Sequence, residues 1–218
     1  MIQLQRVDNC VDLIFPAVGS PVPVNHGYAL YAAVSRVVPG IHSAAGVGIF
    51  PIQGTFNGGR LHLNTSSSVR IRLPAERLPM LLPLAEAVIE IDGHRLRLGT
   101  PRVHALIPAP TLISRLVLIK IAHTGERGGV TPDSFLAAAR KQLVALSVAA
   151  EPAIPLVSSG LHAGEPQRRI VRVKEQTHAG YAMVVEGLTA DESIRLQEAG
   201  IGGRRLIGCG LFLPSVRT

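Results

Sequence analysis

The apolar and polar positions of the first hundred residues predict strands and helices in alternation. The run "CVDLIFPAV" at 10–18 predicts a buried strand, and the turn-rich segment "GSPVPVN" follows it. Asn25 can cap a helix through "HGYALYAAVSRVV", which Pro39 and Gly40 end. A second strand is predicted at 46–54 in "GVGIFPIQG".

The pattern then changes to alternation, which is typical of half-buried strands. "GRLHLN" and "SVRIRLP" both alternate apolar with polar residues. "AERLPMLLPLAEAVI" predicts a helix that Pro79 and Pro83 bend or break. "IEIDGHRLRLG" predicts a hairpin that turns at Asp92 and Gly93. The order of elements is therefore β-α-β-β-α-β.

The same order recurs after "LIPAPTL", a segment with two prolines that we interpret as a linker. A strand is predicted at 112–123, and Thr131 and Pro132 begin a helix that continues through "DSFLAAARKQLVALSV". "AIPLVS" predicts a short strand, and "RRIVRVKEQ" and "YAMVVEGL" predict a hairpin around "THAG". Thr189 and Glu192 form a capping box for a last helix, Gly200 ends it as its C′ residue, and "RLIGCGLFL" predicts the final strand.

Two β-α-β-β-α-β halves predict an α+β protein made of two tandem ferredoxin-like (RRM-like) domains. We expect the first domain to span residues 1–106 and the second to span residues 112–218. Each domain would hold an antiparallel sheet with its helices on one face.

The charge balance narrows the choice of partner. Lys and Arg number 22 against 15 acidic residues, and the isoelectric point is near 10.2. A chain this basic is typical of proteins that bind nucleic acid. The alternatives are a protein that binds an anionic membrane surface and a soluble basic protein without such a partner. Arg greatly outnumbers Lys, which favours nucleic acid, although a GC-rich genome gives the same bias.

The remaining composition excludes several classes of protein. Cys10 and Cys209 lie in apolar runs without a C-x-x-C motif, so we expect buried thiols, a reducing compartment and no structural zinc. No run reaches about 18 uninterrupted apolar residues and no signal peptide is evident, so we expect a cytoplasmic protein that does not enter membranes.

The C-terminal segment "GIGGRRLIGCG" is a candidate phosphate-binding loop. Its glycines follow a helix and precede a strand, the reverse of a dinucleotide-binding fingerprint, and no G-K-[ST] follows. Exposed backbone amides with Arg204 and Arg205 suit a phosphate backbone. The alternative is a helix cap and a β-bulge beside two solvated arginines. The candidate RNA contacts here are Gly200, Gly202, Gly203, Arg204, Arg205, Gly208 and Gly210.

A second basic segment lies at 168–176. As a strand, it would place Arg168, Ile170, Arg172 and Lys174 on one face, which is strongly cationic. That face suits an RNA backbone, and a solvated edge strand is the alternative.

Two of the eight histidines bracket the first predicted helix. His26 lies in its first turn and His42 follows its end in a glycine-bounded loop. A histidine can move a proton to or from a reacting hydroxyl, and RNA cleavage by the neighbouring 2′-hydroxyl needs only such transfers and charge stabilisation. We expect the other six to be surface or hydrogen-bonded histidines, and no local spacing predicts a metal site.

Three segments resemble the Cas-six family of CRISPR repeat-processing endoribonucleases in the RAMP superfamily, and its MYXAN subtype most closely. They are the glycine loop "GIGGRRLIGCGLF", the segment "PGIHSAAGVGIFPIQG" and the block "VDLIFPAVGSPVPVNHGYALYAAVSRVVPGIH". Together they cover residues 10–54 and 186–213, whereas the middle of the chain matches only in its order of elements.

The resemblance implies metal-independent cleavage of precursor CRISPR RNA within its repeats, leaving a 5′-hydroxyl and a 2′,3′-cyclic phosphate, with no cofactor. It implies His42 as general acid or base and His26 as the alternative, with Tyr28 assisting unless Tyr28 is a core aromatic. A lysine that the family places after the histidine has no counterpart in "SAAGVGIFP". CRISPR repeat RNA is the implied partner, other CRISPR effector subunits are a second class of candidate partner, and a non-catalytic RNA-binding scaffold is the alternative function.

Overall fold

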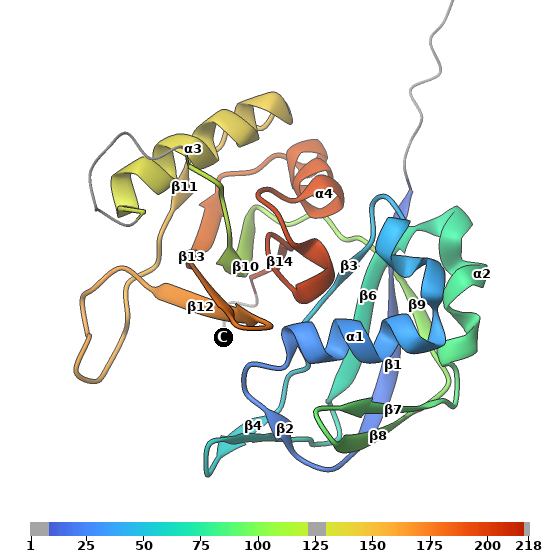
Figure 1. Ribbon diagram of the computed structural model, residues 1–218. Helices are drawn as coiled ribbons and strands as arrows, with labels where there is room; N and C mark the ends of the chain where they lie inside the picture. The colour runs from blue at the N-terminus through green and yellow to red at the C-terminus, as the bar shows by residue number, and fades with distance from the viewer. Residues whose placement is uncertain (1–8, 122–129, 216–218) are drawn as a thin grey trace, which may run out of the picture. The chain divides into compact units, whose positions relative to one another are not determined.

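The computed structural model describes residues 9–121 and 130–215, and the chain divides into two compact units, Met1–Leu106 and Ile107–Thr218. Both units combine helices with antiparallel sheets (Figure 1). The predicted α+β class is confirmed.

The first unit is built around one long strand, β1. Its helices and strands are β1 (Cys10–Gly19), β2 (Val22–Pro23), α1 (Gly27–Val37), β3 (Gly48–Ile49), β4 (Thr55–Asn57), β5 (Arg60–His62), β6 (Ser68–Pro74), α2 (Leu78–Leu81), β7 (Val88–Ile91), β8 (His94–Leu98) and β9 (Arg102–Ala105). The main sheet has the order β3-β6-β1-β8-β7, with β9 also paired to β1. Leu13, Phe15 and Ala17 of β1 face the core, because alternate residues of a strand share a face.

The second unit has the same plan with different lengths. Its elements are β10 (Thr111–Val117), α3 (Pro132–Ala145), β11 (Pro152–Ala153), β12 (Arg168–Val173), β13 (Gln176–Glu186), α4 (Ala190–Ala199) and β14 (Leu213–Pro214). The sheet has the order β11-β13-β10-β14, with β12 also paired to β13. Phe135, Leu143, Met183, Leu196 and Phe212 are among the residues of its buried core.

Both main sheets follow the strand order of a ferredoxin-like domain, in which the first strand lies between the third and the fourth. In the first unit the first strand is β1, the third is β6, and β8 and β9, which both pair with β1, take the place of the fourth. In the second unit these strands are β10, β13 and β14. The prediction of tandem ferredoxin-like domains is therefore confirmed.

Several predicted boundaries in the first unit are wrong. The helix predicted over "AERLPMLLPLAEAVI" is only four residues long, with a 3₁₀ turn on each side, because Pro79 and Pro83 interrupt the hydrogen-bond ladder. The strand predicted at 46–54 pairs only at Gly48–Ile49. "GRLHLN" contributes β5 to a separate sheet of order β2-β5-β4.

In the second unit the last predicted strand is the largest error. Arg205–Ile207 form a 3₁₀ turn, and only Leu213–Pro214 pair with β10. The hairpin turns at Lys174 and Glu175 rather than at "THAG", since β12 and β13 pair from Val173–Gln176 onward. "AIPLVS" pairs only at its start, in β11. Residues 122 and 123 of the strand predicted at 112–123 lie outside the described residues.

The glycine loop lies against the backbone that ends β10. The amide of Gly210 donates to the carbonyl of Leu116 (2.8 Å) and the amide of Gly203 to that of Leu118 (2.9 Å). A Cβ on Gly202 would lie 2.4 Å from the Leu118 oxygen, closer than any side chain tolerates. The loop can approach β10 this closely only because glycine has no side chain at such positions.

Glu192 fixes the start of α4. One carboxylate oxygen accepts from the amide of Ala149 (2.7 Å), and the other accepts from the amide (2.9 Å) and hydroxyl (2.8 Å) of Thr189. The predicted capping box is thus confirmed, and it also holds the chain after α3. These hydrogen bonds, that of Ala149 first, lower the pKa of Glu192 to about 2.

The two adjacent glycines of the loop should respond differently to alanine. Gly202 has φ +77° and a blocked Cβ position, whereas a Cβ on Gly203 meets nothing within 4 Å. We predict that Gly202→Ala lowers the free energy of unfolding by about 1–3 kcal/mol and that Gly203→Ala changes it by less than about 0.5 kcal/mol. Urea unfolding monitored by circular dichroism measures both; equal effects would contradict the packing described for the loop.

Glu192 should make stability depend on acid. Its pKa is about 2 in the folded chain against 4.5 for the ordinary group, so its contribution is complete above about pH 4.5 and is lost as the pH falls toward 2. We predict that Glu192→Gln is less stable than wild type at pH 7 and that the difference shrinks below pH 4.5. Unfolding curves between pH 2 and 7 test this, and a difference independent of pH would contradict it.

Candidate functional site

His42 lies in a 3₁₀ turn, Pro39–Ser43, directly after α1. Its ring nitrogen Nδ1 is 2.6 Å from the carbonyl oxygen of Pro39 and therefore donates its proton there. This bond orients the ring and leaves Nε2 as the unprotonated nitrogen of the neutral imidazole. Since the side chain is exposed, Nε2 can exchange a proton with a bound molecule.

His26 has the opposite character, because it is buried and both ring nitrogens are engaged. Its exposed fraction is 2%. Nδ1 lies 2.8 Å from the carbonyl oxygen of Pro23, and Nε2 accepts from the amide of Ile52 (2.9 Å). The ring ties the start of α1 to the segment after β3. This is the geometry of a structural histidine, which must break two hydrogen bonds before it moves a proton.

The two histidines stand at opposite ends of α1. A helix of 11 residues is about 16 Å long, so His26 and His42 cannot both reach one phosphodiester. Tyr28 is half-buried in the first turn, with its ring centroid 6.3 Å from that of Tyr31. It is therefore near His26 and remote from His42.

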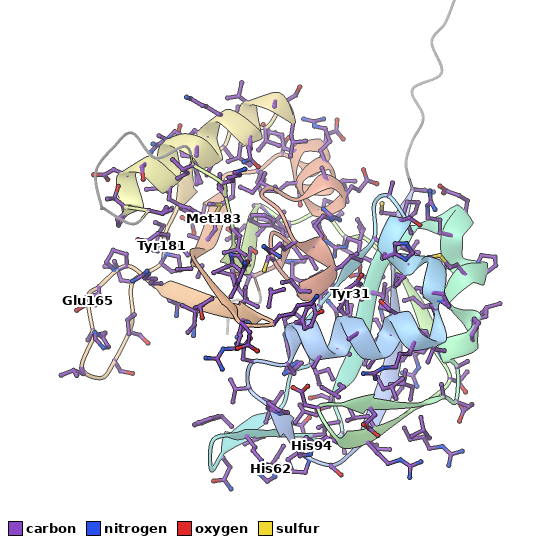
Figure 2. The ribbon with its side chains drawn as sticks, viewed as in Figure 1. Tyr31, His62, His94, Glu165, Tyr181 and Met183 are labelled. Carbon is purple, nitrogen blue, oxygen red and sulfur yellow. The ribbon has the colours of Figure 1, made fainter. Side chains whose placement is uncertain are left out.

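The glycine loop lines a basic pocket in the second unit. The pocket has a volume of about 860 Å³ and receives the exposed part of the loop, Gly202, Gly203 and Arg204. Its apolar wall includes Leu118, Ile119, Val130, Ala179 and Tyr181, and its cationic side chains are Lys120, Arg168 and Arg204. Tyr181, labelled on β13 in Figure 2, is held by a hydrogen bond from its hydroxyl to the carbonyl of Val130 (3.0 Å).

Two contacts set the geometry of the loop inside this pocket. The side-chain oxygen of Gln142 on α3 accepts from the amide of Gly202 (2.6 Å). The guanidinium of Arg204 donates to Nε2 of His178 on β13 (3.0 Å). The loop thus presents a cation whose direction is fixed by contacts with α3 and β13. An apolar wall beside cationic side chains suits a nucleotide, whose base is flat and whose phosphate is anionic.

The other residues of the glycine loop have structural positions. Arg205 donates to the carbonyls of Ala199 and Glu198 and so caps the C-terminal end of α4. Gly200 is the C-cap residue of α4, where a Cβ would meet the carbonyl of Gly210. Gly208 and Gly210 are buried with positive φ. The exposed surface of the loop is therefore confined to its middle.

The predicted basic residues of the hairpin formed by β12 and β13 also differ in their positions. Arg168 lies on β12 and lines the pocket, and Arg172 is exposed further along the same strand. Lys174 is not on the strand face predicted for it, because β12 ends at Val173 and Lys174 occupies the turn with φ +52°. A turn residue no longer follows the alternation of the strand.

Sequence reasoning missed most of the pocket residues, among them Lys120, Gln142, His178 and Gly180. The segment "THAG" predicts a turn that contains His178 and Gly180, but both residues lie on β13. A Cβ on Gly180 would lie 2.1 Å from the carbonyl oxygen of Val117, so this glycine permits close contact with β10 rather than a turn. A glycine inside an otherwise regular strand pattern is the signal that could have indicated it.

Cys209 does not offer a reactive thiolate at neutral pH, because burial raises the pKa of its thiol to about 12. Both Cys10 and Cys209 are buried, and they form no disulfide. Among residues 9–121 and 130–215, no three His, Cys, Asp or Glu side chains gather as a metal site would require. No helix in these ranges is long and apolar enough to cross a membrane.

Known proteins resemble the chain over most of its length. The family model "Cas6 Crispr" matches residues 11–217. The CRISPR-associated endonuclease Cas6 of Myxococcus xanthus (strain DK1622) is 42% identical over 208 residues, which cover 95% of this chain and 83% of that protein.

Solved structures share the fold at low sequence identity. A Cas6-related protein from Pyrococcus furiosus has a TM-score of 0.67 at 12% identity and covers 94% of this chain and 98% of its own. A CRISPR-associated protein Cas6 has a TM-score of 0.63 at 10% identity, over 95% and 99% of the two chains. A RAMP protein described as binding different RNA substrates has a TM-score of 0.62 at 14% identity, over 93% and 98%. With the family model and the Myxococcus relative, this shared fold leads to one conclusion: the chain belongs to the Cas6 family of CRISPR-associated endonucleases.

Proposed function

We propose that this protein is an endoribonuclease that cuts precursor CRISPR RNA within its repeats, with His42 as the group that moves the proton. The observation that carries the proposal is the exposed Nε2 of His42 on a ring oriented by the carbonyl of Pro39. Family membership supports the reaction class, and the basic pocket supports RNA as the substrate.

The proposed reaction is an internal transfer of the phosphodiester. The 2′-oxygen attacks the adjacent phosphorus as its proton leaves to a base, the bond from phosphorus to the 5′-oxygen breaks, and the 5′-oxygen takes a proton. The products are a 2′,3′-cyclic phosphate and a 5′-hydroxyl, and no metal ion enters the balance. The neutral imidazole of His42 can accept the first proton at Nε2, and its protonated form can donate the second. Only one of these roles falls to His42 in a given cleavage.

Charge on the pentavalent phosphorus needs a cation, and the lysine found in the family after this histidine is absent. Arg36 in the last turn of α1 is the arginine closest in the chain to His42. Its guanidinium donates to the carbonyl of Glu90 (3.2 Å) and the side chain remains exposed. We propose Arg36 for this role, because it lies at the same end of α1 as the imidazole.

Binding is proposed to rest on the pocket of the second unit. Arg168, Arg204 and Lys120 would contact phosphates, while the open space over Gly203 and the apolar wall would accommodate the nucleotide. Gly200, Gly208, Gly210 and Arg205 are left out of this contact set, because their described contacts are with the protein itself.

The experiment that tests the function is incubation with a labelled cognate repeat RNA in EDTA. Cleavage at one position, with a 5′-hydroxyl that polynucleotide kinase can label, is the expected result. An RNA-binding scaffold subunit without activity is the alternative, and it predicts tight binding without cleavage. Failure of wild type to cut several cognate repeats would overturn the enzyme proposal.

His42→Ala should abolish most of the activity without affecting the fold. We predict a fall of about 10²- to 10⁴-fold in the single-turnover rate, because a positioned acid or base contributes about that much. Added imidazole should restore part of it. His162→Ala, at an exposed histidine of the second unit, is the control and should cleave at the wild-type rate.

His26→Ala should affect stability instead. It leaves the Ile52 amide and the Pro23 carbonyl without their partner, at a cost of about 1–3 kcal/mol for each buried group. The rate per folded molecule should remain near that of wild type. An active His42→Ala beside a folded but inactive His26→Ala would reverse the roles proposed for the two histidines.

The pocket arginines should govern affinity rather than rate. Arg168→Ala and Arg204→Ala are each expected to weaken repeat-RNA binding and to reduce the slope of log K against log salt by about 0.7, the value for one single-strand phosphate contact. The cleavage rate at saturating RNA should stay unchanged. Arg140→Ala on α3, at an arginine paired with Glu151, is the matched control; an equal loss there would contradict a specific pocket.

A further inference from the structure

The main sheet of the first unit carries arginines on the face away from its core. Leu13, Phe15 and Ala17 of β1 point into the core, so Asp12, Ile14 and Val18 point to the opposite face. Directly paired residues share a face in an antiparallel sheet. The residues paired with Asp12, Ile14 and Val18 therefore lie on this same outer face of the sheet.

Five arginines occupy this face by register. Arg72 pairs with Asp12, Arg70 and Arg102 flank Ile14 on its two sides, and Arg97 pairs with Val18. Arg95 lies two residues from Arg97 on β8 and shares its face. The pattern R-x-R in β6 and again in β8 places both arginines of each strand on the same side.

The carboxylates on the same face do not balance these charges. Asp12 is held by Arg72 in a bidentate pair (2.8 and 2.9 Å), with Arg70 3.9 Å away. Glu90 on β7 is paired with Arg95 on β8. Five guanidinium groups against two carboxylates leave a surplus of three positive charges among the described residues of this face.

Three of the arginines form an exposed line. Arg95, Arg97 and Arg102 all lie along the same side of β1, and each side chain is exposed. Arg102 is opposite Ile14, and Arg95 is next to Ser20, whose amide donates to the Arg95 carbonyl (3.2 Å). Six residues of strand separate these two positions, so the line is about 20 Å long. His94, at the start of β8 and labelled in Figure 2, precedes this line in the chain.

We propose that this arginine line binds the phosphate backbone of single-stranded RNA outside the pocket of the second unit. The inference adds a second RNA contact to the proposed function and rests on it for the identity of the RNA. An extended line of exposed cations matches a repeating anion, and guanidinium groups bind phosphate in two-point contacts. Because the proposed contact is with phosphate groups, it should not depend on nucleotide sequence.

The test compares full-length protein on two RNAs, a repeat alone and the same repeat extended by about 20 uridines on either side, by fluorescence anisotropy at several salt concentrations. Arg95→Ala/Arg97→Ala should bind an extended RNA about tenfold more weakly than wild type and lower the salt slope by about 1.4, two single-strand contacts. Arg95→Lys/Arg97→Lys keeps both charges and should retain most of the slope. Arg140→Ala/Lys141→Ala removes two positive charges from α3 and is the matched control.

The outcomes separate this contact from the proposed catalysis. The alanine variant should cut the unextended repeat at the wild-type rate under saturation, so loss of that rate would overturn the inference. Equal losses in the α3 control would also overturn it, because they would indicate a general effect of net charge. Preferential binding of the arginine line to vesicles of phosphatidylserine and phosphatidylcholine, with RNA affinity unchanged, would assign the face to a membrane surface instead. Inactivity of wild type toward any repeat would refute the proposed function, while the salt dependence on uridine-extended RNA would still report on this face.

Discussion

The contact on which the second unit depends is the close approach of the glycine loop to the end of β10. Backbone amides of the loop bond to the carbonyls of Leu116 and Leu118, and a Cβ on Gly202 would exclude that approach. Because the loop is fixed there, the residue that follows Gly203 projects into the pocket. Arg204 adopts the left-handed conformation and reaches His178, so its charge stands at a defined place. Glycine at these positions therefore acts mainly on the shape of the loop, and through that shape on the charge it presents.

A comparable constraint distinguishes the two candidate histidines of the first unit. His26 and His42 flank the same helix, and their surroundings give them different hydrogen bonds. His26 is enclosed with both nitrogens bonded and joins two segments of backbone, whereas His42 is held at one nitrogen only. One hydrogen bond to Pro39 is enough to orient the ring, and leaving Nε2 unengaged preserves its capacity to take a proton. The division into a structural and an exposed histidine follows from hydrogen bonding rather than from position in the sequence.

The sequence was sufficient for the fold class and for most elements, because alternation, capping residues and prolines act locally. The helix cap at Thr131, the capping box at Thr189 and the ferredoxin-like plan of both sheets agree with these predictions. It was insufficient where long-range contacts decide the conformation. Nothing local reveals that Arg205 turns back to cap α4 or that Gly180 lies under β10. The pocket brings together residues from six segments of the chain, so only the resemblance and the cluster of arginines pointed toward it.

The central claim is that RNA lies against two defined places, the middle of the glycine loop and the exposed imidazole after α1. Photocrosslinking of a 4-thiouridine-substituted repeat, followed by mass spectrometry of the linked peptides, tests this most directly. The account predicts links to the peptide containing Gly202, Gly203 and Arg204 and, for a uridine next to the scissile phosphate, to the peptide containing His42. Links confined to other surfaces, with neither of these peptides modified, would contradict it.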